Sequence, residues 1–264
     1  MDLQKLCAEA KEIIKETGAY ISTEAKQFSS DAVESKGVHD FVSFVDKTAE
    51  KQLVEGFKKI LPGAGFIAEE QTETYRSEQY NWVIDPLDGT TNFIHGLMPY
   101  AISVALMEKD ELILGIIYEI SRDEMFYAWK GSKAYLNNSE ISVTKAKKVT
   151  DSLIATGFPY YDYDRLPQFM KTLDFFMRNS HGLRRLGSAA TDLAYVACGR
   201  FDAFYEYSLS PWDVAAGAFI VQQAGGKVSD FNGGTNYVFG KEIIASNNNI
   251  HNEFLKDIKD IMNS

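Results

Sequence analysis

Hydrophobic residues recur at helical spacing in the first sixty residues of the chain. Apolar positions from Leu3 to Thr17 follow intervals of three and four, with Lys and Glu between them, and Gly18 relaxes the pattern. A second run of this kind extends from Thr48 to Ile60 and is stopped by Pro62-Gly63. The spacing predicts two amphipathic helices with a small-residue, polar loop over 29–37 between them.

Beyond residue 64, short apolar runs replace this periodicity. They carry β-branched and aromatic residues and are separated by polar turns, which predicts a mainly antiparallel sheet. The expected strands cover 65–68, 82–84, 101–107, 112–118 and 125–129. Later strands are expected at 153–156, 201–205, 227–229 and 243–245, alternating with helices at 166–177, 191–198, 214–223 and 250–262. This order favours an α+β or layered αβ architecture in one compact domain over 1–264, with 1–150 and 151–264 as possible subdomains.

Composition narrows the class of protein. The 264 residues are 45% hydrophobic and 24% charged, which is ordinary for a globular protein, and the net charge of −10 argues against binding a nucleic-acid polymer or an anionic membrane. No stretch approaches the roughly 20 apolar residues of a membrane span. Cys7 and Cys198 lack the spacing of a metal or redox motif, so we expect buried free thiols and a cytoplasmic location. His39 and His251 are expected at the surface.

The segment 82–93 carries the strongest chemical signal. An apolar strand ends in Asp85, Pro86 fixes a turn, Asp88 follows three residues later, and Gly89 opens a run of small residues whose backbone N–H groups can point outward. Two carboxylates on one tight turn repel each other, and a divalent cation between them would remove the conflict. Asp85 as a plain turn residue and Asp88 as a helix cap is the alternative.

Two further acidic segments favour the metal interpretation. Glu69-Glu70 ends another apolar strand, and Asp213 begins a helix of small residues. Carboxylate oxygens brought together in one cleft suit Mg²⁺, which also takes water and phosphate as ligands.

These segments resemble the signatures of the inositol monophosphatase family, part of the lithium-sensitive, Mg²⁺-dependent phosphomonoesterases. The resemblance rests on Asp85–Phe93 (DPLDGTTNF) and Trp212–Gly217 (WDVAAG), with Glu69-Glu70 upstream, and it spans essentially the whole chain. It implies the layered αβαβα sandwich of the sugar phosphatase fold, two or three Mg²⁺ ions per site, inhibition by Li⁺, and a homodimer.

The resemblance also implies roles for individual residues. Glu69, Asp85 and the Leu87 carbonyl match the ligands of a first metal, and Asp85, Asp88 and Asp213 match those of a second. Asp46 and Thr90 match the pair that orients and deprotonates the attacking water. Together with the metal ligand Glu69, they are the implied catalytic residues. Gly89 and Thr90 match the phosphate donors. Substrate contacts are implied for Asp88, Gly187, Ser188, Ala189, Glu206 and Asp213, and loop contacts are considered for Lys36 and Arg184.

The implied reaction is hydrolysis of inositol 1-phosphate or a similar small phosphate ester by metal-activated water. Activity on the 2′-phosphate of NADP or on fructose 1,6-bisphosphate remains open at the same site, because the aromatic run 160–163 and the Arg184-Arg185 pair could serve a larger substrate. A catalytically silent binding or scaffold protein on this fold is the alternative from another class. The GAGFIA segment at 63–68 has the residue types of a dinucleotide-binding motif. Its context differs from that motif, because it precedes an expected strand and not a helix. An aspartyl-phosphatase motif would place its second acid two residues on, and here the interval is three.

Overall fold

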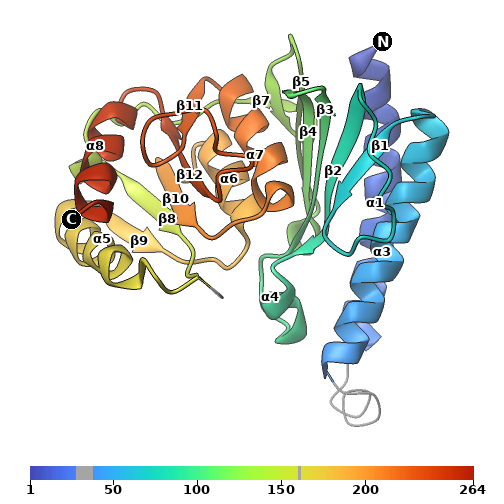
Figure 1. The fold of residues 1–264 in the computed structure, drawn as a ribbon, viewed down its shortest axis with the longest axis horizontal. Helices are drawn as coiled ribbons and strands as arrows, with labels where there is room; N and C mark the ends of the chain where they lie inside the picture. The colour runs from blue at the N-terminus through green and yellow to red at the C-terminus, as the bar shows by residue number, and fades with distance from the viewer. Residues whose placement is uncertain (28–37, 160–161) are drawn as a thin grey trace.

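The chain folds into five alternating layers of helices and strands, seen edge-on in Figure 1. The computed structural model describes residues 1–27, 38–159 and 162–264. Its longer helices are α1 (Leu3–Gln27), α3 (Val38–Ile60), α5 (Leu166–Asn179), α6 (Ala189–Ala197), α7 (Pro211–Gln223) and α8 (His251–Met262), and its short ones are α4 (Thr90–Ile94), η1 (Ile120–Arg122) and η2 (Val149–Asp151). The layered αβαβα arrangement that the family resemblance implies is confirmed.

The first sheet has seven strands in sequential order, and its strands are antiparallel except for the parallel pair β1·β2. They are β1 (Gly65–Ala68), β2 (Tyr80–Asp88), β3 (Ala101–Glu108), β4 (Glu111–Glu119), β5 (Glu124–Trp129), β6 (Ala134–Leu136) and β7 (Ser139–Ile141). The predicted antiparallel sheet is therefore present, extended by the short strands β6 and β7 that the apolar runs did not indicate.

The second sheet has five strands in the order β11-β12-β10-β8-β9. They are β8 (Leu153–Thr156), β9 (Gly182–Arg184), β10 (Ala203–Tyr207), β11 (Gly226–Ser229) and β12 (Glu242–Asn247). Here β8 runs parallel to both β9 and β10, whereas β12 is antiparallel to its neighbours. All strands of the first sheet precede residue 142 and all of the second follow residue 152.

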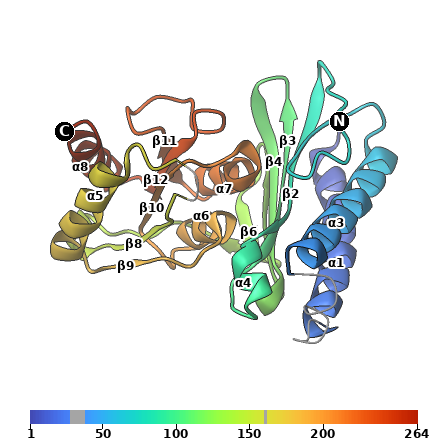
Figure 2. The same ribbon diagram turned by 60° about the horizontal axis from the view of Figure 1, so that its bottom comes forward.

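Hydrophobic cores fill the spaces between the five layers. The two faces of the first sheet contribute to different cores, as alternate residues of β3 show. Ile102, Val104 and Leu106 pack toward α1 and α3, whereas Ala101 and Ala105 pack toward α6 and α7. Figure 2 shows α6 and α7 between the two sheets. Helix α7 is buried from Val214 to Val221, as a helix with apolar residues on every side must be. A third core joins α5 and α8 to the outer face of the second sheet.

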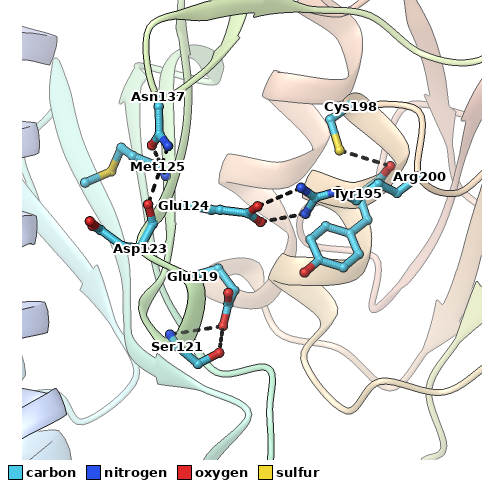
Figure 3. Close-up of polar contacts among 9 residues, drawn as sticks. All are labelled: Glu119, Ser121, Asp123, Glu124, Met125, Asn137, Tyr195, Cys198 and Arg200. Carbon is cyan, nitrogen blue, oxygen red and sulfur yellow. Dashed lines mark hydrogen bonds and ion pairs between the residues drawn. The ribbon is translucent and has the colours of Figure 1, made fainter.

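Polar contacts also connect the first sheet to the helices behind it. Arg200, which follows α6, donates to both carboxylate oxygens of Glu124 at the start of β5, at 2.5 and 2.7 Å (Figure 3). The guanidinium lies 4.5 Å from the ring centroid of Tyr195, and the Cys198 thiol contacts the Tyr195 carbonyl. Cys7 and Cys198 are both free thiols, Cys7 buried and Cys198 partly exposed.

Two local predictions are corrected by the structure. Helix α1 does not weaken at Gly18 but continues to Gln27. Gly18 lies against Tyr118 so closely that a Cβ there would overlap the ring, so the glycine serves this contact and does not end the helix. His251 is fully buried and not at the surface. Within the described residues, no helix combines the length and the apolar character needed to cross a bilayer.

His251 provides a test of stability against pH. Its ring nitrogens lie 3.2 Å from the Ser229 hydroxyl and 2.9 Å from the Ser246 hydroxyl, and burial lowers its pKa from 6.5 to about 4. Because the folded pKa is lowered, the contribution of His251 to stability is complete above pH 6.5 and is lost as the pH falls toward 4. Between these values the histidine is protonated in the unfolded chain but stays neutral in the folded protein. The shift corresponds to about 3 kcal/mol.

We therefore expect the unfolding free energy of the wild type to fall by about 3 kcal/mol more than that of His251→Gln between pH 7 and pH 4. Urea titrations of both proteins across this range measure the difference, which cancels the titration of all other groups. Parallel curves would contradict the assignment.

Candidate active site

A β-bulge places the two carboxylates of the DPLD segment. Asp85 pairs with Ser103 and Asp88 pairs with Ala101, so β2 has one residue more than β3 over this stretch. Such a bulge bends the strand and tolerates Pro86, which has no N–H to give the ladder. The Leu87 N–H donates to Asp85 Oδ1 at 2.9 Å. The turn therefore holds Asp85, which is only 2% exposed, in one orientation.

Asp88 connects the turn to the start of α6. Its Oδ2 accepts hydrogen bonds from the Ser188 hydroxyl at 2.6 Å and from the Ala190 N–H at 2.7 Å. Gly89 follows with φ +88°, and a Cβ there would lie 2.9 Å from the Pro99 carbonyl oxygen. Only glycine fits this left-handed, crowded position at the start of α4. The first turn of a helix also leaves its N–H groups without partners inside the helix.

Glu69 and Asp213 complete the acidic group from two other elements. Glu69 directly follows β1, and its N–H donates to the Ile84 carbonyl at 3.2 Å. Asp213 lies in the first turn of α7, where its Oδ2 accepts the Ser210 N–H at 2.7 Å. The Ser103 hydroxyl donates to the Trp212 carbonyl at 3.0 Å and so ties the start of α7 to β3.

Glu69, Asp85, Asp88 and Asp213 line a cavity of about 580 Å³ between the two halves of the molecule. Burial raises the pKa of Asp85 well above its ordinary value, and the neighbouring charges of Glu69, Asp88 and Asp213 raise it further. Burial likewise raises the pKa of Glu69 to about 7, of Asp88 to about 6 and of Asp213 well above normal. The four carboxylates thus line one cavity in which their negative charges oppose one another.

The donor set fits a divalent cation. In the described residues no three His, Cys, Asp or Glu side chains are already arranged to hold a metal. Four carboxylates that line one cavity and have raised pKa values nevertheless offer the hard oxygen ligands that Mg²⁺ prefers. A divalent cation bound between them would offset their repulsion.

Thr90 and Asp46 are close to this site but are not hydrogen-bonded to each other. The Thr90 hydroxyl donates to the Leu87 carbonyl at 2.9 Å. Asp46, on α3, is 8% exposed, and its Oδ1 has no hydrogen-bond partner among the described residues. Burial raises the pKa of Asp46 to about 8, with contributions from Glu70 and Glu69. The Leu87 carbonyl and the Thr90 hydroxyl therefore satisfy each other in this conformation.

The opposite wall of the cavity is formed by the second half of the chain. The predicted substrate contacts Gly187, Ser188, Ala189 and Glu206 all line it. Arg185 lines it too, whereas Arg184 is exposed and donates to the carbonyl of its neighbour Leu183. Lys36 lies outside the described residues, as do 160–161 of the aromatic run, and Tyr163 is 57% exposed.

Two positioning residues escaped the sequence analysis. Glu50 is fully buried on α3 and accepts hydrogen bonds from the Glu70 N–H and from the N–H and hydroxyl of Thr72, each at 2.7 Å. Asn92 donates to the carbonyls of Pro99 and Leu186 at 2.7 and 2.8 Å, which joins α4 to the Gly187 loop. Asn92 is part of the signature segment, and Glu50 is one helical turn beyond Asp46. These sequence positions are the signals by which the two residues could have been found.

The five layers and the acidic cavity between the sheets define the class, a layered αβαβα protein of the sugar phosphatase fold. The chain belongs to the inositol monophosphatase family, whose model matches residues 2–263.

Individual relatives agree with this assignment. A protein named inositol-1-monophosphatase from Mesorhizobium japonicum is 38% identical over 92% of this chain and 91% of its own length. Nus factor SuhB from Escherichia coli is 40% identical over 89% of this chain and 90% of its own. The structure of the inositol monophosphatase from Anabaena superposes with a TM-score of 0.87 at 31% identity, covering 98% of this chain and 97% of that one.

Proposed function

We propose that the protein is a Mg²⁺-dependent phosphomonoesterase that hydrolyses inositol 1-phosphate or a similar small polyol phosphate by direct attack of water. The observation that carries the proposal is the convergence of Glu69, Asp85, Asp88 and Asp213 beside the glycine-led start of α4. Family membership supports a phosphatase.

The residues of the cavity would have separate roles in binding Mg²⁺, binding the phosphate and activating water. Glu69, Asp85, the Leu87 carbonyl, Asp88 and Asp213 would hold Mg²⁺, which when bound neutralises the phosphate and lowers the pKa of coordinated water. The backbone N–H groups of Gly89 and Thr90 bind the phosphate oxygens. The Thr90 hydroxyl orients the attacking water and takes its proton while passing its own proton to Asp46 Oδ1. The Thr90 hydroxyl must leave the Leu87 carbonyl for this, which frees that carbonyl as a ligand. As the water oxygen bonds to phosphorus, the bond from phosphorus to the alcohol oxygen breaks, and that oxygen takes a proton from solvent.

The alcohol portion of the substrate lies against Gly187, Ser188, Ala189 and Glu206. A cavity of about 580 Å³ is within the range of small-molecule sites. Two buried carboxylates on this wall, Asp192 and Glu206, favour an alcohol rich in hydroxyl groups over one that carries a second phosphate. This favours inositol 1-phosphate over fructose 1,6-bisphosphate and over NADP, with its diphosphate bridge.

A binding protein without catalytic activity is the second candidate, because the relative from Escherichia coli carries the name Nus factor. The presence of every acidic ligand expected of the family favours the phosphatase. The two candidates predict opposite results in one assay.

Purified protein is expected to release inorganic phosphate from inositol 1-phosphate with Mg²⁺, to stop when EDTA is added in excess, and to be inhibited by Li⁺. The measurement is phosphate release across inositol 1-phosphate, NADP and fructose 1,6-bisphosphate, compared by kcat/KM. A folded, Mg²⁺-supplied protein that releases no phosphate from any of them would favour the binding protein.

A further inference from the structure

Asp192 is a buried carboxylate in the cavity wall that the proposed reaction does not use. It lies in the first turn of α6, is 1% exposed, and lines the cavity. Its Oδ1 has no hydrogen-bond partner among the described residues. A carboxylate oxygen removed from water without a donor costs free energy. The wall is therefore short of a hydrogen-bond donor at this point.

Nearby charges place Asp192 on the side of the cavity that receives the alcohol. Burial raises its pKa well above the ordinary value, Glu206 and Asp88 raise it further, and Arg185 lowers it. The same Arg185 charge lowers the pKa of Glu206, which burial and the charges of Asp213 and Asp88 raise. Asp192 and Glu206 thus stand on the same wall with Arg185 close to both.

The neighbours of Asp192 are firmly placed. Glu206 packs over Gly157 so closely that a Cβ on residue 157 would overlap its carboxylate. The Arg185 guanidinium lies 5.3 Å from the ring centroid of Phe158. Ser188 directs its hydroxyl to Asp88 at 2.6 Å and is not a donor for Asp192 in that state. A hydroxyl of a molecule that enters the cavity can supply the donor that Asp192 Oδ1 lacks.

The hydrogen-bonding inventory of the wall identifies the chemistry of that molecule. Ionised carboxylates only accept hydrogen bonds and a guanidinium only donates them. A hydroxyl group does both, so adjacent hydroxyls on one ring can donate to Asp192 and Glu206 and also accept from Arg185. An alkyl or aryl alcohol portion would leave Asp192 Oδ1 without a hydrogen-bond donor.

We propose that Asp192 is a specificity-determining residue, whose Oδ1 accepts a hydrogen bond from a ring hydroxyl of a polyol monophosphate. The inference rests on the proposed function, because it concerns the alcohol portion of that substrate. It adds an acceptor to the family-implied contact Glu206, and it assigns Asp192 to discrimination between alcohols and not to hydrolysis.

The test compares two esters that differ only in the ring hydroxyls, inositol 1-phosphate and cyclohexyl phosphate. Asp192→Asn keeps the shape of the side chain but removes the charge and one acceptor. We expect kcat/KM for inositol 1-phosphate to fall about 10- to 100-fold, mostly through KM, because a hydrogen bond to a charged group is lost. For cyclohexyl phosphate we expect a change of less than about threefold.

The matched control is Asp202→Asn. Asp202 is a second buried aspartate, but its oxygens accept from the Thr144 hydroxyl at 2.6 Å and the Leu153 N–H at 2.7 Å, and it does not line the cavity. Any loss it causes should be equal for both esters. Asp192→Ser, which suits the small residues around it on α6, replaces Asp192→Asn if that variant does not fold.

Equal losses on the two esters, or no loss on either, would overturn the role of Asp192. A wild type that shows no preference between the esters would also overturn it. A wild type that releases phosphate from neither ester contradicts the proposed function instead, so the two failures are distinguishable.

Discussion

Asp85→Asn is expected to abolish phosphate release while leaving the protein folded. Asp85 lies among Glu69, Asp88 and Asp213, and its charge is the one that both metal positions would share. Losing an outer-sphere partner of a metal ligand typically costs 10- to 100-fold, so the loss of a bridging ligand should exceed about 100-fold. The measurement is phosphate release from inositol 1-phosphate at millimolar Mg²⁺.

The same variant should change thermal stability in opposite directions with and without metal. In the folded protein the pKa of Asp85 is raised, so its contribution to stability is complete below the unfolded value near 4 and is lost as the pH rises through the folded pKa. The neutral amide avoids this loss, and its oxygen can still accept the Leu87 N–H. In EDTA the variant should therefore have the higher Tm at pH 8, with the difference shrinking toward pH 4.

With Mg²⁺ the order should reverse, because binding to the native state raises the Tm of the wild type and much less that of the variant. Asp110→Asn is the matched control, since Asp110 is exposed in the β3–β4 turn and loses the same charge. It should behave as the wild type in every condition. Near-normal turnover by Asp85→Asn, or a lower Tm than the wild type in EDTA at pH 8, would contradict the metal site.

Features set by residues close together in sequence were predictable. The apolar run of β3 was predicted as a strand from neighbouring residues alone, whereas β2, expected to end at Asp85, continues through a β-bulge to Asp88. The end of α3 and the whole of β1 were also predicted, because Pro62-Gly63 separates them, but α3 begins at Val38 and not at Thr48 as the spacing of apolar residues predicted. The candidate metal ligands follow from such local signals together with the family resemblance.

Features set by distant contacts were not predictable from the pattern. Gly18 appeared to weaken a helix, but it permits the close approach of Tyr118, a hundred positions away in the chain. His251 looked like a surface histidine, yet two serines from β11 and β12 provide hydrogen bonds for its buried ring. For the neighbouring Arg184 and Arg185, the sequence could not show which side chain faces the cavity. The orientation of this segment depends on the pairing of β9 with β8.

Glu50 is the strongest case of a residue whose role depends on such contacts. One carboxylate accepts three hydrogen bonds from the segment that follows Glu69, across some twenty positions of the chain. The N–H groups of residues 70 and 72 belong to no strand, so Glu50 supplies the partners that secondary structure would otherwise provide. The position of Glu69 in the cavity thus depends on α3 as well as on β1.

Glu50→Ala is therefore expected to lower the unfolding free energy by about 3–5 kcal/mol, since it leaves buried donors unsatisfied and opens a cavity. Glu50→Gln should lower the unfolding free energy less, by about 1–3 kcal/mol. The amide oxygen still accepts some of the hydrogen bonds from residues 70 and 72, whereas the amide NH₂ faces a backbone N–H that it cannot accept. Urea titration measures both. Glu55→Ala, an exposed glutamate on the same helix, is the matched control and should stay within about 0.5 kcal/mol of the wild type.

The Mg²⁺ dependence of activity, measured on folded Glu50→Gln protein, distinguishes a residue that positions Glu69 from one that only stabilises the fold. If Glu50 positions Glu69, the Mg²⁺ concentration for half-maximal activity should rise about 10- to 100-fold in Glu50→Gln, as for outer-sphere partners of metal ligands. At saturating Mg²⁺ the activity should largely recover, because the ligands themselves are intact. A variant that is destabilised as expected but keeps the Mg²⁺ dependence of the wild type would show that Glu50 supports the fold without setting the geometry of the metal site.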